Sequence, residues 1–157
     1  MYRSRPRQPE PHRAFSTLTQ IRQMYSTQNT QPIPFGIRVT RYTDPMAPFA
    51  RTTPDDGRLY YAKLVGLRTS QTAALMYMRG GERREFEVPL GIFELRYASG
   101  FIWFGEGDLF GPETVRSKAD RLMEFRVEGD TVAGRQVRLI KQTDGNLSTS
   151  RLIPDQF

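Results

Sequence analysis

Short segments in which apolar and polar residues alternate restrict the fold of this chain more than any other feature. In residues 35–40, Phe35, Ile37 and Val39 alternate with glycine, arginine and threonine. This period of two is typical of a strand with one buried face. Similar segments recur at spacings of about ten residues, separated by turn residues, which favours an antiparallel sandwich or barrel. The sequence therefore predicts a mainly β fold.

The expected strands follow directly from this pattern. They occupy residues 35–40, 59–67, 73–78, 84–88, 93–97, 122–127 and 137–139. Gly80 and Gly81 supply a tight turn, so residues 73–88 are predicted to form a hairpin. Residues 43–58 hold three prolines and are expected to be a long loop, either functional or an insertion.

Length and composition indicate one folded domain. A chain of 157 residues, 38% hydrophobic and 11% aromatic, is large enough for one sizeable core. We expect an N-terminal arm over residues 1–34 and a single β domain over residues 35–157. Without an apolar leader or a long apolar segment, the expected protein is cytoplasmic and makes no contact with a membrane.

The positive charge of the chain is concentrated near its start. The net charge is +6, and residues 1–58 hold nine basic and four acidic residues. Residues 1–13 are rich in proline and arginine, which predicts an extended arm that needs a partner to become ordered. Arginine suits carboxylates and phosphates. The arm could bind an acidic protein, follow a phosphate backbone with Tyr2 stacked on a base, or stay solvated; arginine-rich coding is a further explanation of its composition.

A short helix is predicted after the arm, at residues 14–26. Its apolar side chains are Phe15, Leu18, Ile21 and Tyr25, spaced by three, three and four residues. Thr17 and Gln20 fit a capping box at its start. The apolar stripe of this helix would pack on the chain's own domain or dock into a partner's groove.

Residues for catalysis are scarce. The chain has no cysteine and one histidine, His12, on the predicted arm, where a general base cannot be held rigidly. A single histidine also gives no zinc site. Glu106, Asp108 and Glu113 could supply a glycosidase pair only if two of them faced each other across a cleft. We therefore expect a protein that is not an enzyme and that has no cofactor, metal or catalytic residue.

The most distinctive segment of the domain is the glycine-rich stretch of residues 101–114. It holds Trp103, the only tryptophan, and Phe110. Both rings could fill the core, or they could be exposed and anchor a partner.

Four sequence blocks carry a resemblance to known proteins. They are YAKLVGL, MRGGERREFEVPLGIFELRYASG, WFGEGDLFGPET and GRQVRLIKQTDGNLST, within residues 59–150. Their order resembles that of a group of uncharacterised bacterial proteins, and the VPLGIF segment is similar to a strand–turn–strand of prealbumin-like and carboxypeptidase-regulatory-like domains. The resemblance implies a small β-sandwich and brings no activity with it. The arm and residues 43–58 lie outside it.

These observations predict a binding protein. The candidate partner-binding residues are Arg3, Arg5, Arg7, Arg13, Phe15, Leu18, Tyr25, Trp103 and Phe110. The first hypothesis is an interaction module that docks into a protein assembly, bacterial or phage-related, through its arm and its aromatic loop. The second is a nucleic-acid-associated accessory protein that uses the arginine-rich arm.

Overall fold

The computed structural model describes residues 30–133, 135–138 and 147–157, and this part of the chain is mainly β. Its larger sheet contains the strands β1 (Gly36–Val39), β3 (Leu59–Gly66), β4 (Thr72–Arg79), β6 (Gly91–Gly100), β7 (Val115–Ala119), β8 (Met123–Glu128), β9 (Thr131–Ala133) and β11 (Thr149–Arg151). The smaller sheet contains β2 (Ala47–Thr52), β5 (Arg83–Val88) and β10 (Arg135–Arg138). Two short 3₁₀ helices, Gly111–Glu113 and Pro154–Gln156, are the only helices among the described residues.

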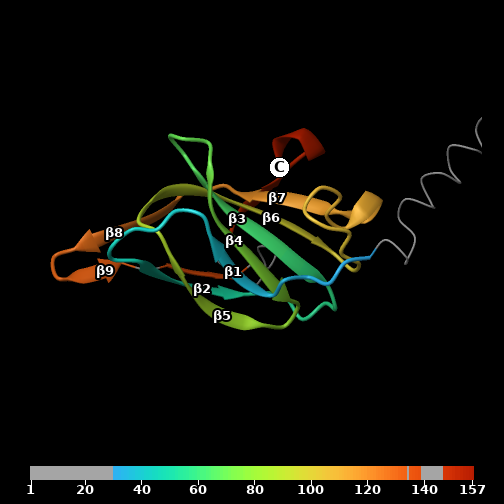
Figure 1. The fold of residues 1–157 in the computed structure, drawn as a ribbon, viewed down its shortest axis with the longest axis horizontal. Helices are drawn as coiled ribbons and strands as arrows, with labels where there is room; N and C mark the ends of the chain where they lie inside the picture. Colours follow the sequence, from blue (N-terminus) through green and yellow to red (C-terminus); the bar gives the residue numbers. More distant parts are fainter. Residues whose placement is uncertain (1–29, 134, 139–146) are drawn as a thin grey trace, which may run out of the picture.

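The larger sheet has the order β1-β4-β3-β6-β7-β11. Outside this order, β8 pairs with both β6 and β9. In the smaller sheet β2 lies between β10 and β5. All pairs are antiparallel except β10 with β2. Figure 1 shows the larger sheet curling over β2 and β5, so the predicted mainly antiparallel β fold is confirmed.

Residues 43–58 are not one long loop, because β2 lies inside them. Ala47, Phe49 and Arg51 of β2 point inward and are buried, whereas Pro48 between them is exposed. A proline and a buried arginine are both rare in a strand, and together they conceal the alternation. The prediction of one long loop was wrong for this reason.

The predicted hairpin of residues 73–88 was also wrong. The turn at Gly80 forms, but β4 pairs with β1 and β3, and β5 pairs with β2. The turn therefore passes the chain from one sheet to the other. The physical cause is that all residues of β4 from Ala73 to Met78 are buried, so this strand is covered on both faces and needs a neighbour at each edge.

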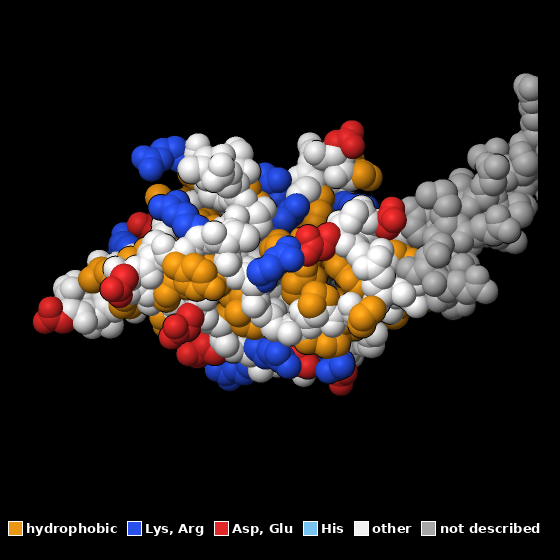
Figure 2. Space-filling view, viewed as in Figure 1, with side chains coloured by type: hydrophobic (Ala, Val, Ile, Leu, Met, Phe, Trp, Pro, Cys, Tyr) orange, Lys and Arg blue, Asp and Glu red, His pale blue; other side chains and the backbone are white. Residues whose placement is uncertain are grey.

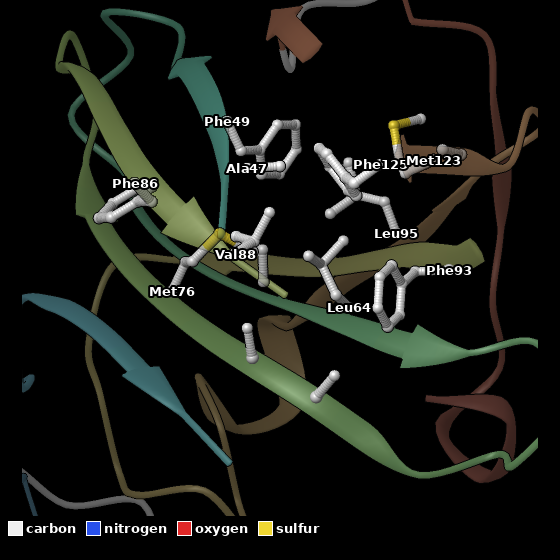
Figure 3. Packing of buried hydrophobic residues seen from close by; sticks show 14 of the residues in the cluster. Ala47, Phe49, Leu64, Met76, Phe86, Val88, Phe93, Leu95, Met123 and Phe125 are labelled. Carbon is white, nitrogen blue, oxygen red and sulfur yellow. The ribbon is translucent and has the colours of Figure 1, made fainter. Parts of the chain in front are cut away.

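The main core lies between the two sheets. Phe49, Phe86 and Val88 of the smaller sheet face side chains of the larger one (Figure 3). The rings of Phe49 and Phe125 meet edge to face with centroids 5.3 Å apart. Each large apolar side chain buried in this way contributes about 1.5–3 kcal/mol, which holds the sheets together.

A second cluster covers the outer face of the larger sheet. Its buried members are Tyr61, Leu75, Tyr77, Ala98, Trp103, Leu109 and Phe110, with Ile33, Leu59 and Phe157 packed against them. Residues 101–114 fold back over the sheet to form this cover, which explains why β4 lacks an exposed face.

The β8–β9 hairpin extends beyond the body at one end of the molecule (Figure 1). Met123 to Phe125 pair with β6, whereas Arg126 to Glu128 pair with β9. The predicted strand at 137–139 corresponds to β10, with Leu139 outside the described residues; β7, β9 and β11 were not predicted. The predicted arm and the helix at 14–26 also lie outside the described residues.

Candidate protein-binding groove

A groove of about 550 Å³ opens where β3 ends and β6 begins. Its lining residues are Arg41, Gly66, Leu67, Arg68, Thr69, Leu90, Gly91, Ile92 and Phe93. A smaller hollow of about 250 Å³ shares Arg41, Gly66, Thr69 and Phe93 with it and continues to Thr40, Gln71 and Thr72. The two hollows therefore form one extended depression.

The loop between β3 and β4 builds one wall of this groove. The loop is closed by the Gly66 amide, which donates to the Gln71 carbonyl at 2.8 Å. The Leu67 amide donates to the Ile92 carbonyl at 3.1 Å, which fixes the loop beside β6. Gly91 turns the chain into β6 with a φ of 146°, where a Cβ would lie 2.9 Å from the Phe93 ring. This tight turn needs glycine and places Ile92 opposite Leu67.

The chemistry of the groove is apolar with a positive rim. Leu67, in the turn that follows β3, is 50% exposed, and Ile92, in β6, is 46% exposed. Arg41 and Arg68 are exposed, and no acidic residue is among the described residues that line the groove. Adjacent apolar side chains flanked by arginine are common at protein interfaces.

Trp103 and Phe110 lie in the second core cluster. They are 4% and 3% exposed, and their ring centroids are 5.2 Å apart. Trp103 also packs against Tyr61 and Tyr77. Of the two alternatives that the sequence left open for these rings, the structure shows the core one.

The exposed apolar side chains of the same loop are Phe101 and Ile102, at 54% and 43%. The guanidinium of Arg58 stacks on Phe101, 4.7 Å from the ring centroid. Residues 101–104 are all apolar and show no alternation. The sequence therefore did not indicate that the first two of these side chains are exposed and the last two buried.

The other predicted site residues, Arg3, Arg5, Arg7, Arg13, Phe15, Leu18 and Tyr25, lie outside the described residues, as does His12. The structure therefore does not test whether these residues bind a partner.

Glu106, one of the carboxylates considered for catalysis, links the aromatic loop to the sheet. Arg38 donates to its Oε1 at 2.6 Å, and the Tyr77 hydroxyl donates to the same oxygen at 2.7 Å. Burial, and then this hydrogen bond, raise the pKa of Tyr77 above its usual range. Asp108 and Glu113 are exposed on the surface. The arrangement of Glu106 is that of a structural contact between β1, β4 and the loop.

Arg51 is a polar feature that sequence reasoning missed. It is 1% exposed, and its Nη1 contacts the sulfur of Met76 at 3.6 Å. Its Nε and Nη2 have no hydrogen-bond acceptor in the part of the chain whose side chains are described. Burial lowers the pKa of Arg51 to about 9. The sequence signal was its place two residues after Phe49, at an inward position of β2.

No protein-family model, curated protein or solved structure matches this chain. The resemblance to prealbumin-like domains therefore stays a prediction. Within the described ranges, no group of three or more His, Asp or Glu residues is arranged to hold a metal ion. The same ranges contain no helix long and apolar enough to cross a membrane.

Proposed function

We propose that this protein is a non-enzymatic interaction module that docks into a protein assembly through the groove at the β3–β4 loop. The observation that carries the proposal is the pair Leu67 and Ile92, two large apolar side chains that stay about half exposed beside an apolar hollow. Covering them with a partner removes apolar surface from water at about 25 cal/mol per Å².

The lining of the groove suits binding. It combines apolar side chains, glycine backbone, threonine and arginine. Arginine and apolar anchors recognise a partner's side chains, whereas hydrolysis needs a positioned general base or nucleophile. The arm of residues 1–34 and the exposed Phe101 and Ile102 would be additional contacts with the same assembly.

Nucleic-acid binding is the competing function, and it would depend on the arginine-rich arm. Figure 2 shows acidic and basic side chains interspersed over the visible face of the domain, where a phosphate-binding face would be mainly basic. The domain therefore favours a protein partner, and the experiment below includes nucleic acid as a separate outcome.

The test is a capture experiment with the full chain in extract of its own host, after nuclease treatment and over a salt series. The groove variant is Leu67→Ser with Ile92→Ser, and the control is Ile153→Ser, which alters a 59% exposed side chain in the C-terminal segment. We expect a protein partner that survives nuclease, that the control retains and that the groove variant loses. Capture that the groove variant leaves unchanged, or recovery of nucleic acid released by moderate salt, would overturn the proposal.

A further inference from the structure

The β8–β9 hairpin has the surface of a docking element. Val127 is 47% exposed, and the side chain of Glu128 is 55% exposed. Asp130 is exposed in the turn, beyond the part of β8 that pairs with β6. An apolar side chain next to two carboxylates therefore stands on a hairpin that projects from the domain (Figure 1).

The charge of this hairpin complements that of the groove. From Glu124 to Ala133 the hairpin carries three acidic residues and one arginine. Arg126 pairs with Glu124 at 3.1 Å and with Glu128 at 2.7 Å, which leaves a net negative tip at Asp130. The groove has Arg41 and Arg68 with no acidic residue among its described lining. Opposite charges across a docking surface favour the correct partner, whereas like charges disfavour wrong partners.

Charge also disfavours the chain's own N-terminal arm as the occupant of the groove. Residues 1–29 hold five arginines against one glutamate, so Arg41 and Arg68 would repel them. The hairpin's net negative charge is the reverse of this, and its exposed Val127 offers an apolar contact to Leu67 and Ile92.

The groove and the hairpin are neighbours in the larger sheet. Ile92, which lines the groove, is paired with Glu124 of β8, and Gly91 is paired with Phe125. From this pairing β8 runs past the start of β6 and away from its own groove. In a two-fold dimer, the groove of each copy can receive the hairpin of the other copy. Two equivalent contacts then form, and the assembly is closed as a dimer.

We propose that the groove receives the β8–β9 hairpin of a second copy of this chain, with Arg41 and Arg68 meeting Glu128 and Asp130 in a two-fold dimer. This inference rests on the proposed function, since it uses the same groove. The first partner of the module is then a second copy of the same chain.

The test is sedimentation equilibrium of the full chain over a range of concentrations. One variant reverses the groove charges, with Arg41→Glu and Arg68→Glu; the other reverses the hairpin charges, with Glu128→Arg and Asp130→Arg. We expect the unmodified protein to dimerise and each variant alone to dimerise at least about tenfold more weakly, equivalent to ~1.4 kcal/mol. A mixture of the two variants should recover the dimer, because each groove then faces an oppositely charged hairpin. Arg151→Glu, at an exposed position on β11, is the matched control and should not change dimerisation.

Unfolding midpoints of all variants establish that they fold. A monomer at every concentration, dimerisation that charge reversal leaves unchanged, or failure of the mixture to recover the dimer would each overturn self-docking. If the protein is monomeric while Leu67 and Ile92 are still needed to capture another protein, self-docking fails and the proposed function stands. If capture is also independent of the groove, both fail.

Discussion

Gly100 lies so close to Phe110 that a Cβ at position 100 would stand 2.2 Å from the Cβ of Phe110. Gly100 is the last residue of β6, and Phe110 belongs to the loop that leaves this strand. The loop therefore folds back directly onto the strand that precedes it, and only a residue without a side chain permits this approach.

This contact predicts a large effect for the smallest possible substitution. Gly100→Ala should lower the free energy of unfolding by about 1–3 kcal/mol, because the added methyl group must displace Phe110. Gly107→Ala, in the same loop, is the control, since a Cβ there would meet nothing within 4 Å. Urea unfolding of both variants provides the comparison; equal stabilities would show that the loop does not pack as described.

Trp103 should behave as a core residue. Trp103→Ala should lower the free energy of unfolding by about 3–5 kcal/mol, whereas Phe101→Ala, at a 54% exposed position nearby, should have a much smaller effect. The tryptophan emission of the native protein should be that of a buried ring, resistant to a soluble quencher. Efficient quenching in the native state would contradict the burial of Trp103.

Arg51 should lower stability. Nε and Nη2 of this buried guanidinium have no acceptor among the residues whose side chains the structure describes, so Arg51→Met should raise the free energy of unfolding by about 2 kcal/mol. Arg83→Met, at an exposed position of β5, serves as the control and should have little effect. A marked loss of stability in Arg51→Met would mean that the guanidinium makes favourable interactions that outweigh its burial.

Alkaline pH should destabilise the fold through its buried tyrosines. Burial, followed by the charge of Glu106, raises the pKa of Tyr61 from 10.0 to about 12. The unfolded chain therefore loses this proton first, and the stability contributed by Tyr61 falls as the pH rises from 10 toward 12. Urea unfolding across this pH range should show that the free energy of unfolding declines less steeply in Tyr61→Phe than in the unmodified protein. In Tyr42→Phe, which alters a 74% exposed side chain, the decline should match that of the unmodified protein. The same slope in all three proteins would contradict this coupling.

The alternation of apolar residues predicted the buried side chains of some strands but not those of β1, where Ile37 is 36% exposed. In β5 and in the first half of β6, exposed and buried residues alternate, so Phe86, Val88, Phe93 and Leu95 were recognisable as inward-facing. The strand β2 was missed because Pro48 and Arg51 conceal its pattern. The hairpin was mispredicted because two glycines indicate a turn but cannot indicate which strands pair, which depends on distant parts of the chain.

The groove could not be predicted for a different reason. Leu67 and Ile92 are separated by 25 positions in the sequence, and no pattern in the sequence indicates that they lie side by side. Their exposure arises because the β3–β4 loop and the turn at Gly91 meet at one end of the sheet. Arg68 follows Leu67 directly in the sequence, but only the folded arrangement places Arg41 beside this pair.

Amide hydrogen exchange can locate the docking surface of the domain. The full chain is compared free, as a dilute monomer, and in the complex that it forms, whether with its own copies or with a captured partner. We expect added protection at residues 66–72 and 90–93, with the β8–β9 hairpin protected as well if the partner is a second copy. Protection confined to other parts of the domain, with the groove exchanging as in the free chain, would contradict docking at the groove.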